Sequence, residues 1–208
     1  MAVTQILSTD DPKAIPTAKH LIRDDGLIAF PTDTIYGVAG DPFNPTALTK
    51  IYAAKERPLE KALPVLIGDL NQLDDLVQFL SGQARRIAEA FWPGALTLVL
   101  PKNQRIPPEL SPYPTIGIRM PDLDFTLRLL AEIGPLATTS ANISNGPNPT
   151  TVDEVRVQLG GRIDLILDGG PTRGPTASTV VDASGAELRI LREGQISLSE
   201  LNAHLGKD

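Results

Sequence analysis

The stretch GLIAFPTDTIYGVAG, residues 26–40, decides how this chain is expected to fold. Its apolar run LIAF, residues 27–30, is short and lies between Gly26 and Pro31, which is typical of a strand buried on both faces. The run is followed by TDTIY, residues 32–36, which places three hydroxyls and a carboxylate at the carboxyl end of the strand. Open α/β sheets bind ligands at that end. An ordinary polar turn after the strand is the alternative interpretation.

Outward from this stretch, helical and strand-like patterns are mixed along the chain. Apolar spacing predicts helices over residues 15–24, 46–55, 70–80, 83–91, 125–132 and 151–159, and a short helix after Ser197. Strands are predicted over 27–30, 63–67, 95–100, 115–119, 136–139, 163–167, 178–182 and 187–191. Thr151 and Ser197 each begin a capping-box pattern. Because the elements do not alternate strictly, we expect a single α/β domain, residues 1–208, with a twisted mixed sheet and flanking helices.

The composition argues against several classes of protein. With 19 Lys and Arg against 25 Asp and Glu, the net charge of −6 disfavours binding of nucleic acid by bulk charge. Cysteine is absent, which excludes disulfides, thiolate chemistry and Cys-based zinc sites. We see no signal peptide and no apolar run near the ~20 residues of a membrane span, so we expect a cytoplasmic protein without membrane contact. His20 and His204 lie in predicted amphipathic helices, where surface or packing roles are expected instead of a catalytic triad.

Polar side chains recur at the ends of four predicted strands. They are TDT at 32–34, Arg119, TTSAN at 138–142, and Ser178 with Thr179. Hydroxyl and amide groups suit a small polar ligand, such as an amino acid or the ribose and phosphates of a nucleotide. Their recurrence favours one shared polar cavity.

A cationic group, KERP at residues 55–58 with Lys61, follows a predicted helix. Lys55 and Arg57 are expected to converge on one polyphosphate, to which Arg57 adds a planar fork of donors. A solvated charge cluster at a helix end is the alternative. The glycine-rich run at 168–178 is a candidate anion nest of backbone amides, although no Walker A pattern occurs. The proline-rich loop at 101–114 is interpreted either as an active-site flap or as a plain surface excursion.

Seven motifs between residues 26 and 194 resemble, in order, those of the YrdC-type threonylcarbamoyl-AMP synthases. They are FPTDTIYG, KERP, WPGALTLVL, TIGIRMP, TTSAN, PTASTV and LREG. The resemblance implies the YrdC α/β fold with a large concave cavity and a nucleotidyltransferase activity. L-threonine, bicarbonate or CO2, and ATP with Mg2+ would give L-threonylcarbamoyladenylate and pyrophosphate, without a metal site built from protein ligands. Partner proteins would then use the product to modify tRNA to threonylcarbamoyladenosine next to the anticodon.

The resemblance also implies roles for individual residues. L-threonine would contact Thr32, Arg119, Thr138 and Ser178, with Arg119 on its carboxylate. ATP would contact Lys55, Arg57, Lys61, Thr115, Ser140, Asn142, Asn148 and Arg192, and catalysis would rest on neutralisation of the triphosphate, chiefly by Lys55 and Arg57. Asp33 is expected near the metal or the amine. Lys61 and Leu66 stand where some members have Asn and His, so Leu66 removes one polar contact to threonine. With its end near Asp208, the chain is expected to lack the extra C-terminal domain of longer members.

Two other functions remain open at this point. An RNA-binding module is disfavoured by the net charge and by only 4% aromatic residues, although weak local RNA binding is compatible with the sequence. A carbamoyl-transfer domain that uses carbamoyl phosphate, as in hydrogenase maturation, usually comes with further domains.

Overall fold

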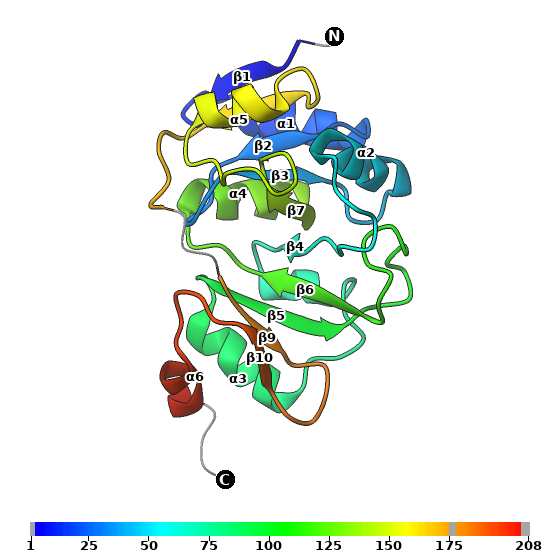
Figure 1. Ribbon diagram of the computed structural model, residues 1–208, viewed down its shortest axis with the longest axis vertical. Coiled ribbons are helices and arrows are strands. Elements are labelled where there is room, and N and C mark those ends of the chain that lie inside the picture. Colours follow the sequence, from blue (N-terminus) through cyan, green and yellow to red (C-terminus); the bar gives the residue numbers. More distant parts are fainter. Residues whose placement is uncertain (1–2, 175–177, 205–208) are drawn as a thin grey trace.

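A ten-stranded sheet runs through the whole computed structural model, which describes residues 3–174 and 178–204. The strand order is β1-β8-β2-β3-β7-β4-β6-β5-β9-β10, with β1 and β10 toward opposite ends of the long axis (Figure 1). The strands are β1 (Gln5–Ser8), β2 (Ile28–Phe30), β3 (Gly37–Gly40), β4 (Val65–Leu66), β5 (Leu96–Pro101), β6 (Thr115–Arg119), β7 (Leu136–Ser140), β8 (Leu165–Asp168), β9 (Thr179–Asp182) and β10 (Arg189–Arg192). Four neighbouring pairs are parallel and five are antiparallel, so the predicted mixed sheet is confirmed.

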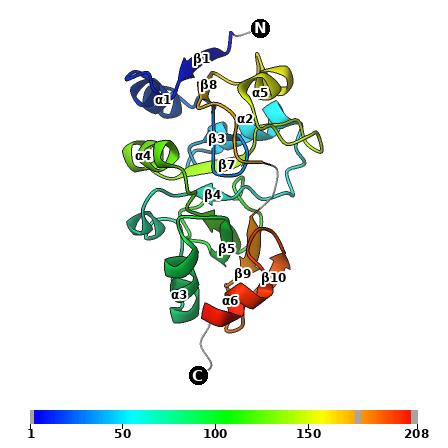
Figure 2. The same cartoon turned by 90° about the vertical axis from the view of Figure 1, so that its left-hand side faces the viewer.

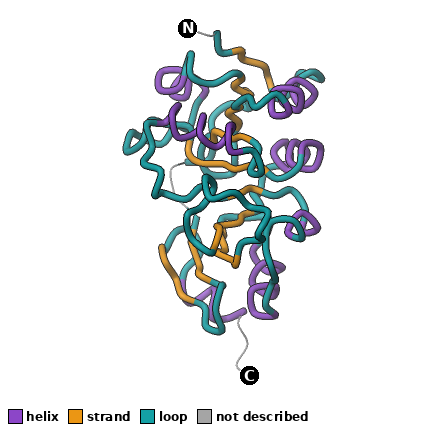
Figure 3. The backbone as a smooth tube through the Cα atoms, turned by 90° about the vertical axis from the view of Figure 1, so that its right-hand side faces the viewer, coloured by secondary structure: helices purple, strands orange, loops and turns teal. Residues whose placement is uncertain are grey.

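The helices cover both faces of the sheet. Helices α1 (Ala14–Arg23) and α4 (Asp124–Ile133) pack against each other on one face, while α2 (Pro45–Lys55) and α5 (Val152–Leu159) lie on the other (Figure 2). Helices α3 (Gly82–Phe91) and α6 (Leu198–His204) contact each other at the C-terminal end of the molecule, which Figure 3 shows from the opposite side. None of the described helices is both long and apolar enough to span a bilayer.

Strand β2 and the residue before it contribute to two hydrophobic cores. Leu27 and Ala29 belong to the cluster that includes residues of α2 and α5, whereas Ile28 and Phe30 belong to the cluster that includes residues of α1 and α4. All four side chains are buried, as predicted for a strand covered on both faces. Strand β2 ends at Phe30, and the turn that follows it stays largely buried, since Thr32, Thr34 and Tyr36 are all buried.

Two strands were not predicted, and one predicted helix is wrong. Strand β3 has the sequence GVAG, whose two glycines and full burial give neither strand propensity nor alternation. Strand β1 is defined by its parallel pairing with β8, which lies more than 150 residues away. Of the helix predicted over 70–80, only a 3-10 turn at Leu70–Leu73 forms, since Val77 is bridged to Lys102 instead.

Both predicted helix caps are present. The Thr151 hydroxyl accepts the amide N–H of Glu154, whose carboxylate accepts the N–H of Thr151, which completes a capping box. The same exchange joins Ser197 and Glu200 at the start of α6.

Candidate active site

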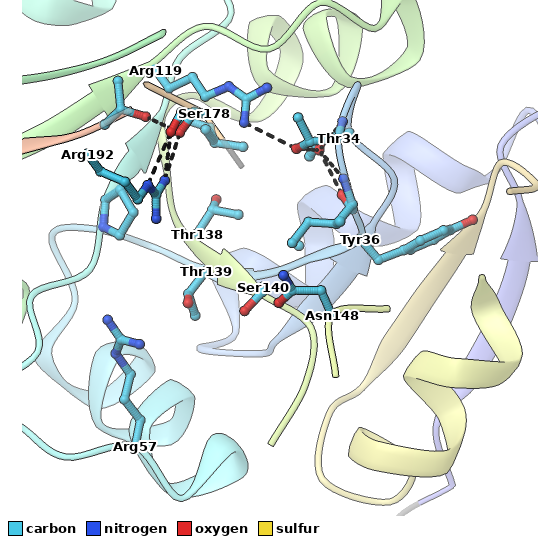
Figure 4. Close-up of a pocket in the computed structure, with 16 residues that line it drawn as sticks. Thr34, Tyr36, Arg57, Arg119, Thr138, Thr139, Ser140, Asn148, Ser178 and Arg192 are labelled. Carbon is cyan, nitrogen blue, oxygen red and sulfur yellow. Dashed lines mark hydrogen bonds between the residues drawn. The ribbon is translucent and has the colours of Figure 1, made fainter. Parts of the chain in front are cut away.

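A cavity of about 330 Å3 lies where the two halves of the sheet meet, at the two-residue strand β4. Its lining comes from the segment after β2, the ends of β6 and β7, the segment after α2, and the chain around β9 and β10 (Figure 4). The lining residues are Thr32, Thr34, Ile35, Tyr36, Gly37, Arg57, Pro64, Leu66, Thr97, Arg119, Thr138, Thr139, Ser140, Asn148, Ser178 and Arg192. All four polar strand ends meet here, so the prediction of one shared polar cavity is confirmed.

The cavity gathers eight of the twelve residues assigned from the resemblance. All four residues expected at threonine line it, namely Thr32, Arg119, Thr138 and Ser178. Of those expected at ATP, Arg57, Ser140, Asn148 and Arg192 line it as well. Leu66 is also in the lining, at the position where some members carry a histidine.

The polar turn after β2 is held by the hydroxyl of Thr32. This oxygen donates to the carbonyl of Ile35 at 2.7 Å and accepts the amide N–H groups of Thr34 and Ile35, each at 3.2 Å. It also lies 3.0 Å from the Thr34 hydroxyl. The turn is therefore closed by its own side chains, which leaves both hydroxyls in fixed positions on the cavity wall.

Arg119, at the end of β6, is bound on three sides. Nη2 donates to both carboxylate oxygens of Asp33 at 2.6 Å, Nη1 donates to the Thr34 hydroxyl at 3.2 Å, and Nε donates to the Gly94 carbonyl at 3.0 Å. Burial lowers the pKa of Arg119, and the charge of Asp33 acts in the opposite direction. Both oxygens of Asp33 contact Arg119; that Asp33 lies near a metal or the amine stays a prediction.

Ser178 and Arg192 form a second polar group opposite the Thr32 turn. Arg192 donates from Nε and Nη2 to the Ser178 carbonyl at 3.2 and 3.0 Å, and from Nη2 to the Ser178 hydroxyl at 3.2 Å. The hydroxyl also lies 2.9 Å from that of Thr97. Thr97 was not predicted; its only signal is a polar residue within the apolar strand sequence ALTLVL.

Arg57 reaches the cavity because helix α2 ends abruptly. Glu56 caps the helix in the left-handed conformation, with φ of 52°. The chain then turns, and Arg57 donates from Nε to the Lys61 carbonyl at 3.2 Å and from Nη2 to the Ala62 carbonyl at 2.9 Å. Burial lowers the pKa of Arg57. Both acceptors are uncharged, so the positive charge of Arg57 is not balanced by these contacts.

The predicted convergence of Lys55 and Arg57 is wrong in this structure. Lys55 is 1% exposed, and its Nζ donates to the carbonyls of Ser140 and Asn142, the latter at 2.5 Å, and to Asn142 Oδ1 at 3.4 Å. Burial, with a smaller contribution from Arg57, lowers the pKa of Lys55 to about 7. Lys55 thus supports the loop after β7 from behind, while the left-handed turn at Glu56 sends Arg57 to the cavity.

Three other assigned residues also lie outside the cavity lining. The Asn142 amide donates to the carbonyls of Ile143 and Gly146 at 2.9 and 2.8 Å, so it shapes the same loop as Lys55. Lys61 is exposed on the segment that holds Arg57. Thr115 begins β6, and its carbonyl accepts the Ser111 hydroxyl at 2.8 Å.

The glycine-rich segment after β8 has no open anion nest in its described part. The amides of Gly169, Gly170, Thr172 and Gly174 donate to the Tyr36 hydroxyl, Asp168 Oδ1, the Thr150 carbonyl and the Thr34 carbonyl, respectively. The nest prediction is wrong for these four amides, and residues 175–177 of the segment lie outside the described chain.

Tyr36 connects this glycine-rich segment to the rest of the site. Its hydroxyl donates to the Gly170 carbonyl at 2.7 Å, its amide donates to the Pro149 carbonyl, and its carbonyl accepts from Ala141. Burial raises the pKa of Tyr36 to about 12, so the phenol stays protonated at neutral pH. The sequence indicated Tyr36 only as one of three hydroxyl-bearing residues that follow the predicted strand.

The proline-rich loop at 101–114 does not line the cavity. Ile106 and Leu110 are buried in the core, and Lys102 Nζ donates to the Ser111 carbonyl at 2.6 Å. Its own side chains thus anchor this loop to the body of the protein; the interpretation as an active-site flap stays a prediction.

Comparison with known proteins gives one family. The Sua5/yciO/yrdC family model, described as "Telomere recombination", matches residues 20–194. A threonylcarbamoyl-AMP synthase of Bacillus subtilis is 43% identical over 98% of this chain, which covers 60% of that protein. A putative threonylcarbamoyl-AMP synthase of Mycobacterium tuberculosis is 36% identical over 99% of this chain, which covers 97% of it. The crystal structure of P. abyssi Sua5 complexed with L-threonine superposes with a TM-score of 0.90 at 35% identity, covering 99% of this chain and 61% of that one.

Proposed function

The chain belongs to the Sua5/yciO/yrdC family, and we propose that it makes L-threonylcarbamoyladenylate and pyrophosphate from L-threonine, bicarbonate or CO2, and ATP. In this proposal the chain is a nucleotidyltransferase. Partner proteins take its product and use it to form threonylcarbamoyladenosine in tRNA. The names of the B. subtilis and M. tuberculosis relatives and the threonine complex of the P. abyssi protein support the proposal.

The observation that carries the proposal is the division of charge in the cavity. The hydrogen bonds of Arg57 and Arg192 described above all go to neutral oxygens, so two positive charges are available to a triphosphate. Arg119, which lies near Arg192, is instead balanced by Asp33 and donates to the Thr34 hydroxyl. A zwitterionic amino acid suits the balanced pair of Arg119 and Asp33, and a polyanion suits the unbalanced charges of Arg57 and Arg192.

The chemistry needs positioning more than a protein nucleophile. The amine of L-threonine adds to the carbon of CO2 and loses a proton, which gives a carbamate. A carbamate oxygen then attacks the α-phosphorus of ATP, and the bond to the bridging oxygen of pyrophosphate breaks. Arg57 and Arg192 stabilise the negative charge of the leaving group, with Lys61 as a further contact from the exposed segment. Thr32, Thr138 and Ser178 orient threonine, while Lys55 and Asn142 keep Ser140 in place.

Mg2+ enters as the counter-ion of ATP in this proposal. Within residues 3–174 and 178–204, no three His, Cys, Asp or Glu side chains gather as a metal-binding group. Mg2+ commonly retains waters and binds substrate phosphates with few protein ligands. In this proposal the phosphates of ATP would hold the Mg2+ ion.

The test is release of pyrophosphate from MgATP and bicarbonate, with and without L-threonine. The wild-type chain should release it only with threonine, and the product should have the mass of threonylcarbamoyladenylate. Arg57→Ala should raise the KM for ATP roughly 10- to 100-fold, as expected when a hydrogen-bonding charge is lost. Arg162→Ala is the matched control, because Arg162 pairs with Glu56 outside the cavity lining. No release by folded wild-type protein with any amino acid would refute the proposal.

A further inference from the structure

The ion pair of Arg119 and Asp33 forms a wall between two cavities. Arg119 lines the cavity of about 330 Å3 described above, whereas Asp33 lines a neighbouring cavity of about 470 Å3 with Gly94, Asp122 and Arg173. The two side chains are only 10% and 8% exposed. The carboxylate thus approaches Arg119 from the side away from the proposed substrates.

The contacts of Arg119 leave little of its guanidinium for a ligand. Asp33 occupies Nη2 with both oxygens, Gly94 takes the N–H of Nε, and Thr34 takes one of the two N–H groups of Nη1. Among the contacts of the described residues, this leaves the second N–H of Nη1, next to the Thr34 hydroxyl that also lines the cavity. One N–H and one hydroxyl suffice for a carboxylate, but they are a poor match for the several oxygens of a phosphate.

Asp33 also balances the positive charge of Arg119, which lies near a second arginine, Arg192. The charge of Arg192 acts on Arg119 and lowers the pKa of Arg119, so the two guanidiniums are close enough to repel each other. Arg192 itself donates to the uncharged oxygens of Ser178. Without a carboxylate at position 33, both arginines would face one cavity unbalanced, an arrangement suited to phosphate.

We propose that Asp33 is a specificity-determining and positioning residue of this cavity. Its carboxylate holds Arg119 in place and balances its charge, so that this end of the cavity accepts a zwitterionic amino acid and rejects phosphate. The triphosphate is thereby directed to Arg57 and Arg192. Discrimination is achieved by removing attraction for the wrong ligand as well as by contacts to the right one. That the amino acid is L-threonine rests on the proposed function, whereas the rejection of phosphate does not.

The test is titration of inorganic phosphate by calorimetry into the full chain and three variants. Asp33→Asn keeps the shape of the side chain and removes its charge, and it should bind phosphate at least about tenfold more tightly than the wild type. Phosphate should also compete with L-threonine in this variant. Thr34→Val is the matched control: it removes a neutral partner of Arg119 and should gain no affinity for phosphate. The double variant Asp33→Asn/Arg119→Met should lose the gain.

Unchanged phosphate affinity in folded Asp33→Asn would overturn the inference, and so would an equal gain in Thr34→Val. If Asp33→Asn is unfolded without anions, refolding by phosphate but not by chloride of equal ionic strength supports the inference, and no refolding overturns it. The two proposals fail separately. Absence of threonine-dependent pyrophosphate release by the wild type contradicts the enzymatic function, whereas the phosphate titration needs no turnover.

Discussion

Removal of the buried ammonium of Lys55 should change how the stability of the protein depends on pH. In the folded state the pKa of Lys55 is lowered from 10.5 to about 7, chiefly by burial. Below pH 7 the side chain is charged in both states, and the cost of burying the charge is present in full. Between pH 7 and 10.5 the unfolded state binds more protons, so the free energy of unfolding rises with pH. Above pH 10.5 the side chain is neutral in both states and its contribution is constant.

The size of this effect follows from the pKa difference. A difference of about 3.5 between the two states corresponds to a rise on the order of 5 kcal/mol across the window, with a slope of about 1.4 kcal/mol per pH unit at most. The three oxygens that accept from Nζ favour the charged form, so this figure is an upper bound. Lys55→Met lacks the titrating group and should not show this rise.

The measurement is urea unfolding of the wild type and Lys55→Met at several pH values between 6.5 and 10. Subtraction of the variant from the wild type cancels the groups that the two proteins share. The difference in unfolding free energy should increase steadily in favour of the wild type across the window. Lys50→Met is the control, because Lys50 is an exposed lysine on the same helix, and its difference should not show a comparable rise. A difference in unfolding free energy between the wild type and Lys55→Met that does not change with pH would refute the conclusion that burial lowers the pKa of Lys55.

Two further substitutions test how the site is held. Tyr36→Phe removes a hydroxyl that donates to Gly170 and accepts from Gly169, so it should lower the free energy of unfolding by about 1–2 kcal/mol in urea titrations; an unchanged value would mean that the segment after β8 is held by its other contacts. Gly37→Ala would place a Cβ 2.7 Å from Cγ2 of Thr138, so Thr138 must move and calorimetry should show weaker L-threonine binding; wild-type affinity would show that Thr138 does not position this ligand.

Much of the fold and most of the candidate site could be predicted from the sequence. The apolar run at 27–30 indicated a strand buried on both faces, and the polar residues at four strand ends indicated one cavity. The motifs also indicated the family, and two capping boxes indicated where α5 and α6 begin. The strand and the two caps were predicted correctly because each depends on neighbouring residues, whose periodicity and capping chemistry act over a few positions.

What only the tertiary structure decided is the direction in which each charged side chain points and which partner balances it. Lys55 and Arg57 are two residues apart, yet the left-handed conformation of Glu56 sends one to the loop after β7 and the other to the cavity. Asp33 and Arg119 are 86 positions apart, and only the sheet brings them into contact. Strand β3 likewise exists because β2 and β7 pair with it, although its sequence has little strand propensity. Such contacts depend on long-range pairing and on single backbone dihedral angles, which a local sequence pattern does not determine.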